Sequence, residues 1–153
     1  MLVSDTMTKK VFRVREDDPL PAIYERMEAL GIRHVPVTRK DKVVGIISDR
    51  DVLKHSLLDG HRLVVPDLTA GQVMTPDVVC CSPSTLVGTV AGKMVARKID
   101  AVVVTKSRGV LAGIVTSTDI MGLLASKPSL YAQRTIPFKF EFFGITEPWG
   151  EAI

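Results

Sequence analysis

The sequence lacks the features that mark a membrane-spanning or exported chain. No stretch approaches the roughly 18 consecutive apolar residues that a membrane-spanning helix needs. The N-terminus has no basic region followed by an apolar core, which argues against a secretion signal. There are only two cysteines, Cys80 and Cys81, and a disulfide between such neighbours on a strand would be strained, because their side chains point to opposite faces. We therefore expect free thiols in a reducing, cytoplasmic environment.

The sequence also lacks the residue patterns of common catalytic and metal sites. No spacing of cysteine and histidine resembles a zinc site. There is no Ser-His-Asp set at a recognisable nucleophile turn, no glycine-rich phosphate loop and no pair of acids in a distinctive context. We therefore expect a protein that is not an enzyme, with no metal and no catalytic cofactor.

The chain is mildly basic, with a net charge of +3 over 153 residues and an isoelectric point near 9.0. Its lysines and arginines are scattered rather than gathered in a stripe, and aromatic residues are few outside the C-terminal tail. This pattern does not favour nucleic acid as a partner. The charge suits an anionic small ligand equally well.

The most informative feature that is present is an internal repeat. Residues 45–51 read GIISDRD and residues 113–119 read GIVTSTD. Upstream of these motifs, a Met-Thr dipeptide at 7–8 recurs at 74–75. A repeat of this kind indicates the architecture before single residues are interpreted.

Setting the two copies in register defines the limits of each repeat. The offset is 67 residues from Met7 to Met74 and 68 residues from Gly45 to Gly113, so the second copy has one extra residue. This residue falls in the turn at 106–109, where a hairpin loop tolerates an insertion. The predicted organisation is repeat one at 3–58, a linker at 59–69, repeat two at 70–126 and a tail at 127–153 without a counterpart.

Each repeat predicts the element order β-α-β-β-α. In the first repeat, Asp18 is expected to cap the first helix, Gly31 to end it, and Ser48 to open the second helix. In the second repeat, Thr85 is the expected counterpart of Asp18. The predicted fold class is α+β, with two units related by pseudo-twofold symmetry.

A single unit of this kind has an apolar sheet face and too little mass to cover it. We therefore expect the two units to pack sheet against sheet around one shared core, with the helices outside. An exposed helix face on each unit should then pair with another copy of the chain, which predicts a homodimer.

These residues resemble a pair of CBS domains, the module named after cystathionine β-synthase. The resemblance covers about 3–126 and rests on the Met-Thr start, on the strand RHVPV at 33–37 and on the pattern G-h-x-[S/T]-x-x-D in both repeats. One such heptapeptide would be a weak signal, whereas two in register are specific. The opening residues, and the lack of an enzyme domain, are also similar to stand-alone bacterial or archaeal CBS proteins of the acetoin-utilisation type.

The resemblance implies a flat, disc-like dimer called a Bateman module, whose clefts often bind adenosine nucleotides. In such proteins the hydroxyl and carboxylate of the motif hold the ribose, and strand residues hold the adenine. The first cleft implied here is lined by Thr8, Val11, Arg33, His34, Pro36, Ser48, Arg50 and Asp51. The second is lined by Thr75, Val78, Val102, Thr116, Ser117 and Asp119.

The chemistry of the motif agrees with this implication. A carboxylate such as Asp51 or Asp119 can accept hydrogen bonds from both hydroxyls of a ribose. Each motif also lies at a helix start, where free N–H groups favour a phosphate. The same spacing is that of a capping box, in which Ser48 or Thr116 and the acid bind backbone N–H groups instead. Ribose binding and helix capping are both open interpretations.

The two clefts are not expected to be equivalent. Arg33 and Arg50 belong to the first repeat. The residues at the matching positions of the second repeat are Asp100 and Thr118. A guanidinium group fits phosphate oxygens, and a carboxylate repels them. The cleft built on Asp51 is therefore predicted to be the better phosphate site. The alternative for each arginine is a solvated surface charge.

The tail contains phenylalanines at the alternating positions 138, 140 and 142, which indicate an edge strand or an extended arm. Such a row is rarely left in water, so it is expected to pack on its own subunit, on the dimer partner or on another protein.

The sequence predicts a regulatory module that senses AMP, ADP or ATP. The adenine nucleotide would act as a regulatory ligand, and the regulated partner would be an unidentified protein. The alternative is a ligand-free CBS scaffold for dimerisation and interaction.

Overall fold

The computed structural model describes residues 1–126, so the strand or arm predicted in the tail lies outside the described residues. The first half of the fold contains β1 (Val14–Arg15), α1 (Leu20–Leu30), β2 (His34–Arg39), β3 (Lys42–Ser48) and α2 (Asp49–His55). Its sheet has the order β1-β2-β3, in which β1 runs parallel and β3 antiparallel to β2.

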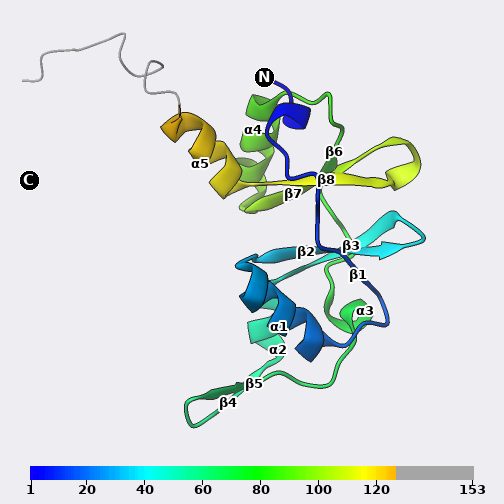
Figure 1. Ribbon diagram of the computed structural model, residues 1–153, viewed down its shortest axis with the longest axis vertical. Helices are drawn as coiled ribbons and strands as arrows, with labels where there is room; N and C mark the ends of the chain where they lie inside the picture. The colour runs from blue at the N-terminus through cyan, green and yellow to red at the C-terminus, as the bar shows by residue number, and fades with distance from the viewer. Residues whose placement is uncertain (127–153) are drawn as a thin grey trace, which may run out of the picture.

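The second half repeats this arrangement with β6 (Cys80–Cys81), α4 (Val87–Arg97), β7 (Ala101–Thr105), β8 (Leu111–Thr116) and α5 (Ser117–Ala125). Its sheet has the order β6-β7-β8, and a short 3-10 turn, η2 (Ser107–Gly109), holds the extra residue of the second repeat. Figure 1 shows the two sheets in the middle of the molecule and the helices on the outside. The predicted α+β class with two β-α-β-β-α units is confirmed.

Buried apolar side chains form two clusters, one in each half. Val35 and Val37 of β2 belong to the first cluster, and Val102 and Val104 of β7 belong to the second. Successive strand residues point to opposite faces, so the fully buried Val103 points to the other side of its sheet. In place of the single shared core expected from the sequence, each half has its own core, because its helices cover one face of its sheet.

Each half also contains the first residues of the other repeat. η1 (Val3–Asp5) packs into the second half, where Val3 is fully buried. α3 (Ala70–Val73) packs into the first half, where Ala70 and Val73 join the core. Figure 1 shows η1, near the N-terminus, in the half that contains α4, and α3 in the half that contains α1 and α2. The beginnings of the two repeats are thus exchanged.

Backbone hydrogen bonds join each exchanged segment to the strand that precedes a motif. The Thr8 N–H donates to the Ile114 carbonyl at 2.9 Å, and the Ile114 N–H donates to the Thr8 carbonyl at 3.1 Å. Thr75 makes the equivalent pair with Ile46, at 2.9 and 3.0 Å. Each Met-Thr dipeptide therefore extends the sheet of the opposite half.

Two strand glycines allow this close approach. A Cβ atom on Gly113 would lie 2.7 Å from the Met7 sulfur and 2.9 Å from the Thr8 carbonyl oxygen. A Cβ atom on Gly45 would collide with the side chain of Met74. Glycine in the repeated motif is therefore explained by the methionine of the other repeat, which occupies the space of a side chain.

The helix ends agree with the sequence in part. Gly31 ends α1 in the left-handed conformation, with φ of 63°, as predicted. The expected caps are wrong, because the N-cap lies one residue later in both α1 and α4. Asp18 accepts a hydrogen bond from the Arg15 N–H at 2.7 Å, and Thr85 accepts one from the Ser82 N–H at 3.1 Å. Each side chain thus closes the turn before the helix. Within residues 1–126, no helix is long and apolar enough to span a membrane.

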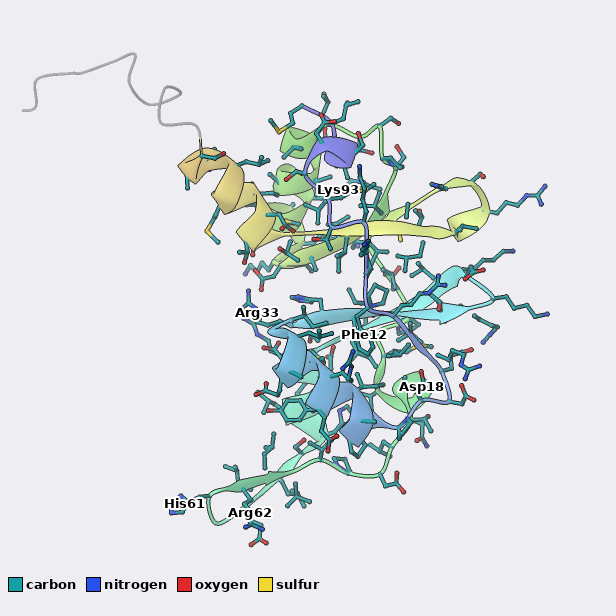
Figure 2. The ribbon with its side chains drawn as sticks, in the orientation of Figure 1. Phe12, Asp18, Arg33, His61, Arg62 and Lys93 are labelled. Atoms are coloured by element: carbon teal, nitrogen blue, oxygen red, sulfur yellow. The ribbon has the colours of Figure 1, made fainter. Side chains whose placement is uncertain are left out.

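A hairpin of β4 (Leu57–Asp59) and β5 (Arg62–Val64) spans the end of the expected first repeat and the start of the expected linker. Figure 2 shows this hairpin projecting away from both sheets, with His61 and Arg62 at its tip. Leu57 and Leu58 are 74% and 78% exposed. The hairpin therefore adds little to either core.

Candidate functional site

Two clefts lie where the halves meet. The first, which we call the Asp51 cleft, has a volume of about 290 Å³. It is lined by the motif residues Ser48 and Asp51 and by Thr75 and Val78 of the second repeat. Its remaining lining is rich in charged residues and comprises Arg33, His34, Ile46, Asp49, Arg50, Lys54, Asp77, Val79, Lys98, Ile99, Asp100 and Ala101.

The second cleft, which we call the Asp119 cleft, has a volume of about 380 Å³. It is lined by the motif residues Thr116 and Asp119 and by Thr8 and Val11 of the first repeat. Its remaining lining is more apolar and comprises Lys10, Phe12, Leu30, Gly31, Ile32, Arg33, His34, Ile114 and Thr118. Both volumes lie near the lower end of the range for small-molecule sites, roughly 300–1,000 Å³.

The structure pairs the predicted residues differently from the sequence analysis, which grouped each motif with the Met-Thr segment of its own repeat. Thr8 and Val11 line the cleft of Asp119, whereas Thr75 and Val78 line the cleft of Asp51. That grouping is wrong because the beginnings of the repeats are exchanged between the halves. Each cleft therefore needs both repeats.

Some predicted residues lie outside the clefts. Pro36 is buried in β2, and Val102 is fully buried in the second core, on the helix side of β7. Ser117 lines neither cleft, whereas Arg33 and His34 line both. The strand alternation explains Val102, because only every second residue of β7 can face the other half.

Four lining residues on the exchanged segments were not predicted from the sequence. Lys10 and Phe12 follow Thr8 at every second position and line the Asp119 cleft. Asp77 and Val79 stand in the same relation to Thr75 in the other cleft. The available signal was their position on the same segments as the predicted Thr8, Val11, Thr75 and Val78, because consecutive residues of these segments line the clefts.

Both motifs form complete capping boxes. The Ser48 N–H and hydroxyl each donate to Oδ2 of Asp51 at 2.8 Å, and the Asp51 N–H donates to the Ser48 hydroxyl oxygen at 3.2 Å. In the second motif, the Thr116 N–H and hydroxyl donate to Oδ2 of Asp119 at 2.7 and 2.8 Å, and the Asp119 N–H donates back at 3.3 Å. The capping interpretation is therefore confirmed for both motifs.

Capping uses only one oxygen of each carboxylate. Oδ1 of Asp51 lies 4.0 Å from the Lys54 ammonium group. For Asp119, the hydrogen bonds that its side chain accepts within residues 1–126 are all at Oδ2. Because a carboxylate oxygen can accept two hydrogen bonds, the second oxygen leaves each motif able to bind a ligand while it caps its helix.

The charges of the clefts differ from the expected pattern. Asp100 was expected to repel phosphate from the cleft of Asp119, but it lines the cleft of Asp51. There its carboxylate lies 3.9 Å from the guanidinium of Arg50. This reason for predicting that the Asp51 cleft is the better phosphate site therefore does not hold, whereas Arg33 and Arg50 line that cleft as expected.

His34 lies at the start of β2, between the clefts. Burial lowers the pKa of this imidazole below its usual value. The opposing attraction of Asp49 is smaller, and Arg33 acts in the same direction as burial. The imidazole is therefore held in its neutral form at neutral pH. Within residues 1–126, no group of three or more acidic, histidine or cysteine side chains could hold a metal ion.

Comparison with known proteins decides the family. The family model of the CBS domain matches residues 3–58 and residues 70–126. The chain belongs to the CBS domain family. The resemblance inferred from the two repeats is confirmed.

Curated relatives of this CBS domain pair are longer proteins. Homoserine O-acetyltransferase of Methanohalobium evestigatum is 31% identical over 124 residues, which are 80% of this chain and 24% of that protein. Inosine-5′-monophosphate dehydrogenase of Methanocaldococcus jannaschii is 30% identical over 118 residues, which are 76% of this chain and 22% of that protein. The chain thus spans about a quarter of the length of these relatives. The reactions that their names state are theirs.

Solved CBS structures resemble the chain over most of its length. The CBS domain pair of protein MJ0100, in complex with 5′-methylthioadenosine and S-adenosyl-L-methionine, has a TM-score of 0.72 and 28% identity, covering 83% of this chain and 98% of that one. A candidate acetoin utilization protein (AcuB) from Vibrio cholerae has a TM-score of 0.72 and 29% identity, covering 86% and 95%. These likenesses agree with the fold described above.

Proposed function

We propose that this CBS domain pair is a regulatory module that binds an adenosine-containing ligand, with adenine nucleotides as the expected class. The observation that carries the proposal is the motif carboxylate in each cleft, which caps a helix with Oδ2 and leaves Oδ1 available. The ligands of the MJ0100 domain pair, which are adenosine compounds, support the same class of ligand.

The ligand contacts follow from ordinary hydrogen-bond chemistry. A ribose offers two adjacent hydroxyl donors, and Oδ1 of Asp51 or Asp119 can accept from them. Apolar side chains beside each motif, such as Val78 in one cleft and Val11 in the other, offer a surface for the purine. Because each cleft is built from both repeats, a bound ligand contacts both halves at once and favours one arrangement of them over another. A partner protein would respond to that difference in population.

The experiment is a thermal-shift panel with adenosine, AMP, ADP, ATP, S-adenosylmethionine and cyclic di-AMP. A ligand at about 100 times its dissociation constant adds about 2.7 kcal/mol to the free energy of unfolding. The diagnostic variants are Asp51→Asn and Asp119→Asn. Asparagine keeps one oxygen for the capping box. In place of the other carboxylate oxygen, the one available to a ligand, it has an amide nitrogen, which cannot accept a hydrogen bond.

We expect the ligand-induced shift to fall in one or both variants while the melting temperature without ligand changes little. Asp5→Asn is the matched control, because Asp5 accepts a hydrogen bond at 2.9 Å from the N–H of Leu2, three residues before it, as the motif aspartates do, and lines neither cleft. Shifts that persist unchanged in both cleft variants would contradict the proposed carboxylate contacts.

The alternative function is a ligand-free scaffold. The completeness of both capping boxes favours it, since the motif residues are satisfied without any ligand. Absence of a shift with every compound of the panel would support the scaffold and remove the sensor function.

We also propose that the module acts as a homodimer. Several large apolar side chains are exposed on the outer helices, among them Leu53 of α2, Val95 of α4 and Met121 of α5. Burying such side chains against a second copy would remove apolar surface from water. Sedimentation of a Val95→Glu, Met121→Glu double variant should show a monomer, whereas Lys93→Glu, an exposed control on α4, should sediment like the wild-type protein. Equal sedimentation of all three would contradict this interface.

A further inference from the structure

The two clefts carry opposite charges at matching positions. The repeat offset of 67 residues pairs Lys10 with Asp77 and Arg33 with Asp100. Lys10 and Arg33 line the Asp119 cleft, and Asp77 and Asp100 line the Asp51 cleft. In a pseudo-symmetric fold, such a reversal changes the charge of the ligand that each cleft prefers while leaving the backbone of the site alike.

We propose that the phosphate of a phosphorylated adenosine ligand is bound in the Asp119 cleft by Lys10 and Arg33, and that Asp77 and Asp100 exclude it from the Asp51 cleft. This inference rests on the proposed function, because it assumes that the motif carboxylates hold a ribose. It assigns the anionic ligand to the cleft that the sequence analysis considered the poorer one.

Two of the four cations in the Asp51 cleft lie close to acids of the same cleft, and the formal charges of its lining cancel. Its lining has four lysine and arginine residues and four aspartates. The Arg50 guanidinium lies 3.9 Å from Asp100, and the Lys54 ammonium lies 4.0 Å from Asp51. A phosphate that enters this cleft would have to displace those carboxylates or lie beside them, and both cost free energy.

Cations in the Asp119 cleft have less competition. Asp119 is the single acid among its lining residues. Within residues 1–126, neither Lys10 nor Arg33 lies within 4.0 Å of a carboxylate. Arg33 also lines the Asp51 cleft, and Figure 2 shows it between the two halves, where α1 ends and β2 begins. Lys10 lines the Asp119 cleft and not the Asp51 cleft. Its positive charge therefore distinguishes the two clefts, which that of Arg33 does not.

The Asp119 cleft also offers the better surface for a purine. Phe12 and Leu30 line it, together with Ile32. In the other cleft, the residue that matches Phe12 is Val79, and the charged Lys98 matches Gly31. An aromatic ring stacks on a purine more favourably than an aliphatic side chain does. The apolar and charged parts of the lining thus both suit an adenosine phosphate.

The test compares AMP with adenosine by titration calorimetry, because the two differ only in the phosphate. In Lys10→Gln and in Arg33→Gln, AMP affinity should fall about 10- to 100-fold, the loss expected when one charge-assisted hydrogen bond is removed. Adenosine affinity should stay unchanged in both. Lys9→Gln and Arg97→Gln are matched controls, because both residues are exposed and line neither cleft.

A charge-reversed variant tests the exclusion. Asp77→Lys combined with Asp100→Arg gives the Asp51 cleft the residues of its counterpart. Measured in an Asp119→Asn background, this variant should bind AMP, whereas Asp119→Asn alone should not. The side chain of Asp100 is 43% exposed, so an arginine can be accommodated at the surface.

The outcomes separate this inference from the proposed function. Retention of AMP binding in Asp119→Asn with loss in Asp51→Asn would overturn the inference and leave the function standing. An unchanged ratio of AMP to adenosine affinity in Lys10→Gln and Arg33→Gln would do the same. If the wild-type protein binds no compound of the panel, the proposed function fails, and the inference fails with it. Binding of S-adenosylmethionine alone would leave the function standing and overturn the inference.

Discussion

Replacing Gly113 with alanine tests the packing that holds the two halves together. The new Cβ atom would lie 2.7 Å from the Met7 sulfur, 3.1 Å from Met7 Cγ and 2.9 Å from the Thr8 carbonyl oxygen. The methionine side chain can rotate away. The carbonyl cannot, because it accepts a hydrogen bond from the Ile114 N–H at 3.1 Å. The exchanged segment must therefore move away from β8.

The expected cost has three contributions. Overpacking of a buried site costs about 1–3 kcal/mol. Weakening the two hydrogen bonds between Thr8 and Ile114 adds up to about 1 kcal/mol for each. Alanine recovers about 0.5–1 kcal/mol, because glycine loses more backbone entropy in a strand. We expect Gly113→Ala to lower the free energy of unfolding by about 2 kcal/mol and the melting temperature by about 4–8 °C.

Urea and thermal unfolding measure this cost. The control is Gly92→Ala in α4, where a Cβ atom would meet nothing within 4 Å, so that alanine should raise stability by about 0.5–1 kcal/mol. Gly45→Ala should cost less than Gly113→Ala, because its nearest atoms all belong to the Met74 side chain. If Gly113→Ala is as stable as the wild-type protein while Gly92→Ala is stabilised, the close approach of the exchanged segment does not constrain the fold, and the reasoning is refuted.

Three further predictions concern the helix ends, the buried histidine and the exchange. Lys98 ends α4 with φ of 53°, so Lys98→Gly should raise stability by about 0.5–1 kcal/mol, whereas Gly31→Ala should lower it by about 1 kcal/mol, both measured by urea unfolding. The lowered pKa of His34 means that the unfolded chain binds a proton first on acidification, so stability should fall from about pH 7 to pH 5 and fall less in His34→Gln. Val3→Ala should cost about 2 kcal/mol and speed hydrogen exchange in β7 and β8 but not in β2 and β3, because Val3 is buried in the second half.

Strand and helix order could be predicted because the signals are local. The strand at 33–37 and the end of α1 at Gly31 depend on residues a few positions apart, and both agree with the structure. The caps at Asp18 and Thr85 were misplaced by one position, because a side chain that caps a helix and one that closes the preceding turn have the same residue preferences.

Cleft residues were predictable as a set but not in their pairing. The motif pattern identified Ser48, Asp51, Thr116 and Asp119, and all four line clefts. Nothing local in a Met-Thr dipeptide indicates which half it joins. The same limit led to placing Asp100 in the wrong cleft, which removes one argument from the prediction of where a phosphate would bind.

The sequence by itself determined the two repeats, the α+β units and the family, since each is expressed in spacings that repeat at a constant offset along the chain. The tertiary structure decided which segment completes which half. That choice depends on contacts that exist only once both sheets have formed: Met7 on Gly113, Met74 on Gly45, and the hydrogen bonds of Thr8 and Thr75. Because the two alternatives bury similar side chains with the same local conformation, only the long-range packing energy separates them.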